Sequence, residues 1–573
     1  MHKGADAIVQ APLRNHTFFG IADVLLRVDP PSALGNHTYE PVDTKLATET
    51  KAGALLQLLT YCELPQVSVL FSLPRYGDTS VRISRTADCG GQRPMQSPLL
   101  LRRCRMPSGT PGFFMRAVLL TSLPLPLFAA LATAQNWTLA TPATSPAAAT
   151  FPRMVFDVQR SVCVAFGGWD APIGNVVFQD TWEWNGTNWT RRSPATVPDE
   201  RESHMMAYDL GRGRTVMFGG QDFNFVLLGQ TWEWNGTNWL NRQPANAPSA
   251  RIWGAMAYDV QRGRTVLFGG EDANSRLNDT WEWDGTNWSQ RSPATSPAVR
   301  ANHAMAYDQA RGRTVLFGGA ASATQFFNDT WEYNGTNWVQ VITDGAPPAR
   351  VDHQIVYDSA RARCVLFGGA DLLIERNDTW EWNGTRWHRL FTATTPPGNG
   401  AMAMAYDSVR NRTVVFGGFD GAAALGTTWQ LGGNAATFRT FGSGCLGSNN
   451  LPPTLVPTAM PTLGTTSALT VTNLPAAAAF AVLAIGFSDQ VSGGNPLPLN
   501  LTSLGLTGCR AYTSAEATVL LPNVGGTATW NFSLPNNAAF AGVRLFQQAL
   551  SLDTAVARPI QAATSNAAEM NLR

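Results

Sequence analysis

The chain has very little lysine and few charged residues of any kind. Its lysines are Lys3, Lys45 and Lys51, and none follows Lys51 in a chain of 573 residues. Charged residues make up 14% of the sequence, whereas an average soluble domain has about 25%. The 42 basic and 41 acidic residues give a formal net charge of +1. We therefore expect no basic patch that could bind nucleic acid.

Histidines and long apolar runs are also scarce. No histidine follows His388, and no Cys-His spacing resembles a zinc site. The apolar run from Ala479 to Gly486 is too short to cross a membrane. We therefore predict no metal site, no other cofactor and no membrane span in the mature chain.

One pattern recurs six times between residues 152 and 430, at steps of 49 to 52 residues. Each copy contains a Phe-Gly-Gly triplet, and these triplets begin at Phe166, Phe218, Phe268, Phe317, Phe367 and Phe416. A Thr-Trp motif follows, with its Trp at Trp182, Trp232, Trp281, Trp331, Trp380 and Trp429. A period near 50 residues indicates a repeat architecture in which each copy is one supersecondary unit.

The residues of one copy predict four antiparallel strands. Two runs rich in β-forming residues flank a turn such as Leu210 to Gly213, which is typical of a hairpin. Alternation in Thr-Trp-Glu-Trp places Trp182 and Trp184 on one face of a third strand, and an Asn-Gly turn leads to a fourth. A lone sheet of this kind cannot bury both faces, so the sheets must stack radially around an axis.

A di-glycine that closes one strand, followed by aromatic residues on the next, resembles the kelch type of propeller blade. The resemblance covers about half of the chain. It implies an all-β protein in which residues 135–433 form a six-bladed kelch-type β-propeller, similar to exported bacterial members and to the central domain of galactose oxidases.

The spacing of the repeats also indicates how the ring closes. From the Trp of each Asn-Trp motif to the first Gly of the next triplet there are 30 residues, and Trp137 stands 30 residues before Gly167. The sixth copy instead has Ala436 where its last Trp is expected. We therefore predict that the strand at Trp137 completes the last blade. The alternative is that residues 437–441 close the ring.

We expect a secretory signal before the repeats. Met115-Arg116, the apolar stretch from Ala117 to Ala132 and a small-x-small site before Gln135 have the order of a signal peptide at 115–134. We accordingly expect residues 1–114 to be an over-extended reading of the gene or disordered, and the protein to be secreted or held in the cell envelope. The alternative is a genuine N-terminal extension with a signal-anchor helix.

Residues 434–573 differ in composition, because Ala, Leu, Thr and Pro replace the aromatic residues. We predict a β-sandwich with strands at 468–471, 480–487, 517–521, 528–534 and 541–546. It resembles the small all-β modules that follow repeats in exported bacterial proteins. Cys445 and Cys509 are predicted to form a disulfide, which an exported protein permits, and Cys163 and Cys364 are predicted to be buried thiols.

An enzyme of the galactose-oxidase group would need a copper-binding histidine from the domain that follows the propeller, and this chain has none there. His204, His303 and His353 recur at one repeat position, so we interpret them as scaffold residues. The repeated glutamates, Glu183, Glu233, Glu282, Glu332 and Glu381, are expected to pair with arginines of the Arg-x-Arg turns, such as Arg212 and Arg214. Aspartates stand two residues after Gly-Gly in five copies, and we interpret them as turn residues rather than cation ligands: Asp170, Asp222, Asp272, Asp371 and Asp420.

Function is expected where the copies differ, in the loops between the second and third strands. These loops should share one face with the connections between blades, and we call it the variable-loop face. Aromatic and arginine side chains are the usual anchors of a binding surface. The candidate ligand-binding residues are Trp169, Arg201, Phe223, Phe225, Arg251, Trp253, Arg300, Phe326, Phe327, Arg350 and Asp352.

The sequence therefore favours an exported, non-catalytic module that binds a carbohydrate or a surface protein through this face. One alternative is an oxidase or hydrolase with a site in the central channel, and another is a structural envelope protein. No catalytic residue is assigned.

Overall fold

The computed structural model describes residues 135–170, 176–371, 374–433, 436–556 and 560–572. It also gives the backbone of four strands nearer the N-terminus. Of these, β1 (Ile8–Gln10) pairs with β4 (Ser80–Arg82), and β2 (Gly20–Arg27) pairs with β3 (Tyr39–Leu46). Residues 1–131 and 132–573 form two separate compact units. The predicted signal segment, 115–134, lies outside the described residues.

Each copy of the repeat forms a four-stranded antiparallel sheet, as predicted, and we number these sheets blades 1 to 6. In blade 2, β10 (Met205–Asp209) and β11 (Arg214–Phe218) make the expected hairpin, followed by β12 (Thr231–Trp234) and β13 (Trp239–Arg242). Gly213 in the hairpin turn has a φ of 63°, which explains why glycine stands there.

The other blades repeat this order. Their strands are β6 (Arg153–Asp157), β7 (Val162–Phe166), β8 (Thr181–Trp184) and β9 (Trp189–Arg192) in blade 1; β14 (Ala255–Asp259), β15 (Arg264–Glu271), β16 (Arg276–Trp283) and β17 (Trp288–Arg291) in blade 3; β18 (Ala304–Asp308), β19 (Arg313–Phe317), β20 (Thr330–Tyr333) and β21 (Trp338–Val341) in blade 4; β22 (Gln354–Asp358), β23 (Arg363–Phe367), β24 (Thr379–Trp382) and β25 (Trp387–Phe391) in blade 5; and β26 (Ala403–Asp407), β27 (Arg412–Phe416) and β28 (Thr428–Gly432) in blade 6.

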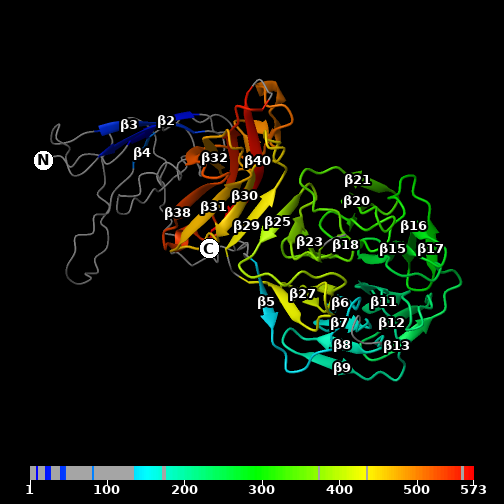
Figure 1. The fold of residues 1–573 in the computed structure, drawn as a ribbon. Helices are drawn as coiled ribbons and strands as arrows, with labels where there is room; N and C mark the ends of the chain where they lie inside the picture. The colour runs from blue at the N-terminus through cyan, green and yellow to red at the C-terminus, as the bar shows by residue number, and fades with distance from the viewer. Residues whose placement is uncertain are drawn as a thin grey trace, which may run out of the picture. The chain divides into compact units, whose positions relative to one another are not determined.

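The blades form a closed ring, the arrangement of a β-propeller (Figure 1). Their first strands contact one another in the order β6, β10, β14, β18, β22 and β26, and β26 contacts β6 again. The fourth strand of blade 6 is β5 (Asn136–Ala140), which pairs with β28 and places Trp137 opposite Leu431. The predicted closure is therefore confirmed. The alternative is wrong, because β29 (Thr437–Phe441) pairs with β25 of blade 5.

A buried tryptophan on the fourth strand bonds each blade to the one before it. In blade 2 the indole Nε1 of Trp239 donates to Oγ1 of Thr181 in blade 1 over 2.9 Å. The same bond, at 2.8 to 3.0 Å, joins Trp288 to Thr231, Trp338 to Thr280, Trp387 to Thr330, Trp137 to Thr379 and Trp189 to Thr428. The six bonds continue around the whole ring, so these tryptophans are structural and not sites.

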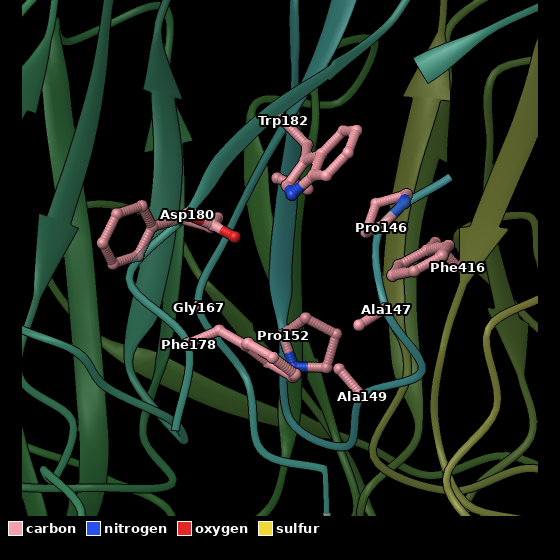
Figure 2. Close-up of a pocket in the computed structure, with 11 residues that line it drawn as sticks. Pro146, Ala147, Ala149, Pro152, Gly167, Phe178, Asp180, Trp182 and Phe416 are labelled. Carbon is pink, nitrogen blue, oxygen red and sulfur yellow. The ribbon is translucent and has the colours of Figure 1, made fainter. Parts of the chain in front are cut away.

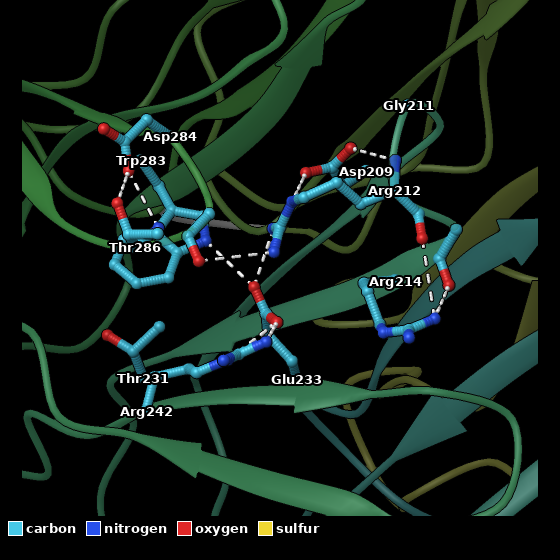
Figure 3. Close-up of polar contacts among 12 residues, drawn as sticks. Asp209, Gly211, Arg212, Arg214, Thr231, Glu233, Arg242, Trp283, Asp284 and Thr286 are labelled. Atoms are coloured by element: carbon cyan, nitrogen blue, oxygen red, sulfur yellow. Dashed lines mark hydrogen bonds and ion pairs between the residues drawn. The ribbon is translucent and has the colours of Figure 1, made fainter.

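The repeated glutamates are paired within their own blades, and all but Glu332, which is half-buried, are buried (Figure 3). Glu233 forms ion pairs with Arg212 and Arg242, each at 2.6 Å, and it also accepts from Nε1 of Trp283 in the next blade at 3.0 Å. The predicted pairing is therefore confirmed for Arg212, whereas Arg214 donates to the Gly213 carbonyl instead. Equivalent ion pairs join Arg160 to Glu183, Arg262 to Glu282, Arg311 to Glu332 and Arg361 to Glu381.

The C-terminal residues form the predicted β-sandwich. One sheet continues from blade 5 and has the order β29, β40 (Ala562–Asn571), β39 (Arg544–Leu552), β32 (Phe480–Gly486) and β37 (Ala517–Pro522). The other sheet has the order β30 (Thr454–Ala459), β31 (Thr466–Thr472) and β38 (Ala528–Ser533). Leu455, Leu469, Leu483 and Met570 are among the buried side chains between the sheets. The remaining, shorter elements are β33 (Val491–Ser492), β34 (Asn495–Pro496), β35 (Leu499–Asn500), η1 (Thr502–Leu504), β36 (Arg510–Ala511) and η2 (Ala538–Phe540).

Four of the five predicted sandwich strands are confirmed, while the fifth lies further along the chain, at β39 rather than 541–546. Cys445 and Cys509 form the predicted disulfide, and Cys163 and Cys364 are buried free thiols, also as predicted. Among the helices of the described residues, none is long and apolar enough to cross a membrane.

Candidate functional site

The variable-loop face is built as the sequence predicted. In each blade, a residue just before the first strand forms a β-bridge with the residue that opens the loop between the second and third strands. These bridges join Thr150 to Trp169, Glu202 to Gln221, Ile252 to Glu271, Ala301 to Ala320, Val351 to Ala370 and Gly400 to Phe419. Loops and inter-blade connections therefore lie on one face.

Three of the predicted aromatic residues meet on this face at the junction of blades 1 and 2. Trp169, Phe223 and Phe225 line a pocket together with Glu202 and Asp222. Phe225 is 65% exposed and Phe223 is 46% exposed. The ring of Phe225 stands edge-on to Trp169, with centroids 6.3 Å apart.

Hydrogen bonds within the loop define the backbone that carries these aromatic side chains. Phe225 has a φ of 60°, an uncommon value for a residue with a large side chain. The Asp222 carboxylate accepts from the backbone N–H groups of Asn224 and Val226, each at 2.9 Å, which confirms its predicted role in the turn. The backbone that carries the exposed phenyl rings is thus held by hydrogen bonds within its own loop.

A buried carboxylate lines the same pocket. Glu202 accepts hydrogen bonds from the Ser203 hydroxyl and the Gln221 amide. Burial raises the pKa of Glu202, although these two hydrogen bonds and the charge of Arg153 act against that shift. Sequence reasoning missed Glu202. The sequence did contain a signal for it, because Glu202 is the one charged residue at its repeat position. The same position is Ile252 in blade 3 and is also uncharged in the other four blades.

The four predicted arginines do not form an exposed rim. Arg201, Arg251, Arg300 and Arg350 are all buried, with at most 1% of each residue exposed. The Nη1 atoms donate to the carbonyl of the first glycine in each Phe-Gly-Gly triplet over 2.8 to 3.0 Å. The prediction that they lie on the surface was wrong, because the repeat position fixes their place along the face but not their depth.

In blades 3, 4 and 5 this arginine belongs to a set of four residues that we call the arginine clamp. In blade 3, Arg251 binds the Gly269 carbonyl and makes two bonds to the Asp279 carboxylate, at 2.7 and 2.9 Å. Asp279 also accepts from Nε1 of Trp281 at 2.7 Å. Blade 4 repeats the clamp with Arg300, Gly318, Asp329 and Trp331, and blade 5 with Arg350, Gly368, Asp378 and Trp380.

Trp253 and Asp352 occupy one repeat position, just before the first strands of their blades, each with a φ of 58°. Asn302 lies between them, donating its backbone N–H to the Trp253 carbonyl and accepting from the Asp352 N–H. Phe326 and Phe327 are partly buried, and the Arg300 guanidinium stacks on the Phe327 ring at 4.2 Å. Phe327 is therefore engaged by the scaffold rather than presented to a ligand.

A second unusual carboxylate, also missed by sequence reasoning, lies in the loop of blade 5. Burial, with the charges of Asp352, Asp371 and Asp420, raises the pKa of Glu375 to about 7. Several carboxylates thus gather near this loop, although within the described residues no three His, Cys, Asp or Glu side chains are arranged to hold a metal.

The repeated histidines are buried, with at most 4% of each residue exposed. His303 stands edge-on to Phe268, and burial lowers its pKa well below the ordinary value. His353 faces the Phe317 carbonyl at 3.1 Å. Neutral, enclosed imidazoles of this kind fit the scaffold role predicted for them.

No protein-family model matches the chain, and no curated protein matches it either. We therefore base the function on the geometry of the variable-loop face.

Proposed function

We propose that the chain is an exported, non-catalytic binding protein of the kelch type, which recognises a glycan or a surface protein through the variable-loop face of its propeller. The Phe-Gly-Gly and Thr-Trp motifs at a period near 50 support the kelch assignment. The Cys445–Cys509 disulfide supports export, because disulfides persist in oxidising compartments.

The observation that carries the proposal is the exposed aromatic pair, Phe223 and Phe225, beside Trp169. Exposed phenyl rings lose contact with water when a ligand covers them, and each ring is large enough to contribute strongly to binding. Because the Asp222 carboxylate already holds the loop backbone, less backbone conformational entropy is lost on binding. Rigid aromatic anchors on a variable loop are typical of recognition surfaces.

The polar groups of the pocket suit ligands that combine apolar faces with hydrogen-bond donors. Glu202 and Asp222 can accept from hydroxyl or amide groups while the aromatic rings cover the apolar face of a sugar or side chain. Small-molecule sites commonly have this composition, mostly apolar with a few placed polar atoms.

The test is a glycan-array and cell-wall pull-down screen with the full chain and a Phe223→Ser/Phe225→Ser variant. A Leu240→Ser/Val339→Ser variant is the matched control, because these two side chains are also exposed, at 53% and 56%, but lie on outer strands. We expect binding by the wild type and the control, and its loss in the phenylalanine variant at unchanged thermal stability.

Equal binding by all three proteins would contradict the assignment of function to this pocket. Turnover of a glycoside or a sugar alcohol by the wild type would instead favour the enzymatic alternative. Absence of binding and turnover in a folded protein would favour a structural envelope role.

A further inference from the structure

The arginine clamp is incomplete in blade 1. In blades 2 to 5 the arginine stands 18 residues before the first glycine of the triplet. The residue at this position in blade 1 is Ala149. The other members are present, as Gly167, Asp180 and Trp182. Ala149 has no side-chain donor, so neither the Gly167 carbonyl nor the Asp180 carboxylate receives the bonds that an arginine makes in blades 3 to 5.

A pocket occupies the place of the missing side chain (Figure 2). All four clamp positions of blade 1 line it, and so does Phe178. The carboxylate of Asp180 points into this space from one side, while Pro146 and Ala147 stand on the other. Ala147 is exposed and Pro146 is half-buried, so the pocket opens to solvent.

Blade 4 shows what such a pocket holds when the clamp is complete. Arg300 makes paired bonds to Asp329, at 2.7 and 2.9 Å, and donates to the Gly318 carbonyl at 2.9 Å. Its guanidinium also lies over the ring of Phe327, two residues before the aspartate. Phe178 stands at the same place before Asp180. Blade 1 therefore keeps every partner of the arginine and lacks the arginine itself.

We infer that blade 1 contains a binding site for a guanidinium group, supplied by a ligand rather than by the chain. A guanidinium is planar, donates in parallel to both oxygens of a carboxylate and stacks on aromatic rings. Asp180, the Gly167 carbonyl and the Phe178 ring are the partners for these three interactions. A lysine ammonium carries no planar fork and is held less well by this arrangement.

The chain already supplies one weak competitor for the carboxylate. Arg191 on β9 pairs with Asp180 over 2.5 Å, and its side chain is 62% exposed. Exposed ion pairs contribute little to stability, so a ligand can displace Arg191. Blade 4 has Gln340 at the matching position, two residues after Trp338. Removal of the Arg191 charge should therefore strengthen binding.

The experiment measures binding of N-acetylarginine amide and N-acetyllysine amide to the full chain by calorimetry, with a short arginine-containing peptide as a third probe. We expect saturable binding of the arginine probe and at least about tenfold weaker binding in Asp180→Asn, because a charged hydrogen-bonded partner is lost. Arg191→Ala should bind more tightly. Ala149→Arg should abolish binding and raise the melting temperature, since the chain then fills its own pocket.

Arg300→Ala provides the positive control, because it opens the same pocket in blade 4. We expect a second binding equivalent in that variant, or recovery of its melting temperature when the arginine probe is added. If the wild type binds no probe while Arg300→Ala does, the inference is wrong. It is also wrong if lysine binds as well as arginine, or if Ala149→Arg leaves both binding and stability unchanged. If the peptide binds more tightly than N-acetylarginine amide, the source of the guanidinium is a protein partner. If the amide binds more tightly than the peptide, the source is a small guanidino compound.

Discussion

Replacing Gln230 in blade 2 by aspartate should complete an arginine clamp that lacks its carboxylate. Gln230 stands two residues before Trp232, at the position of Asp279 in blade 3. Within the described residues, Nη2 of Arg201, Oε1 of Gln230 and Nε1 of Trp232 are all buried without a hydrogen-bond partner. In blade 3, the Asp279 carboxylate accepts hydrogen bonds from both Arg251 and Trp281, which are the equivalents of Arg201 and Trp232.

The structure sets the size of the expected gain. Burial lowers the pKa of Arg201 to about 10, and a shift of this size corresponds to roughly 3 kcal/mol. A hydrogen bond to a charged group contributes about 1.5–3 kcal/mol. Desolvation of the new carboxylate opposes both contributions, because burying an ion costs several kcal/mol. We therefore expect Gln230→Asp to raise the free energy of unfolding by about 1–3 kcal/mol.

Urea denaturation of the full chain, followed by tryptophan fluorescence, measures this change. Gln230→Asn is the matched control, because it has the shape of the aspartate without its charge. Asp279→Asn tests the complete clamp in blade 3, where removal of the charge should cost about 3–5 kcal/mol since it leaves Arg251 buried and unpaired.

The pH dependence of the gain follows from blade 5. Burial alone would raise the pKa of Asp378, but the hydrogen bond and charge of Arg350 outweigh it and leave the pKa below the ordinary value. A carboxyl with a lowered folded-state pKa stabilises above its unfolded pKa, about 3.9 for aspartate, and loses that contribution on acidification. The advantage of Gln230→Asp over Gln230→Asn should therefore vanish at low pH. Equal stability of the two variants at pH 7 would refute the reasoning.

Three further predictions concern other parts of the molecule. The raised pKa of Glu375, about 7, means that the folded state holds the proton more tightly than the unfolded chain, so stability should fall as pH rises from about 5 to 7, and Glu375→Gln should remove that slope in urea titrations at several pH values. Reduction of the Cys445–Cys509 disulfide, which spans 64 residues, should lower stability by about 2–5 kcal/mol in denaturation with and without reductant. Loss of the bond from Trp338 to Thr280 in Trp338→Phe should cost about 1–2 kcal/mol, and a double-mutant cycle with Thr280→Val should show coupling between the two positions.

Much of the propeller could be predicted because its sequence repeats. The alternation of aromatic residues, the di-glycine and the constant spacing of 30 residues identified the four strands of each blade, and they assigned Trp137 to blade 6. The glutamate pairing with Arg212 followed from the same logic, since both residues recur at fixed places.

Depth and long-range pairing could not be predicted in the same way. Spacing placed Arg251 near the variable-loop face, but only the folded chain shows it beneath that face and bonded to Asp279. The strand β40 was missed because its Ala, Ser and Thr residues show no clear alternation of apolar and polar positions. Its partners β29 and β39 depend on contacts distant in sequence, which local propensity does not reveal.

The same clamp, interrupted in two adjacent blades, has opposite consequences because the remaining charges differ in their access to water. Asp180 in blade 1 is 29% exposed and pairs with a surface arginine, so its charge is tolerated without the missing guanidinium. Arg201 in blade 2 is fully buried and has no carboxylate, so its charge remains costly. An accessible anion inside a preformed arginine pocket can be neutralised by a ligand from outside, whereas an enclosed cation can be neutralised only by changing the chain. Blade 1 is for this reason the place to look for a ligand, and blade 2 the place to look for added stability.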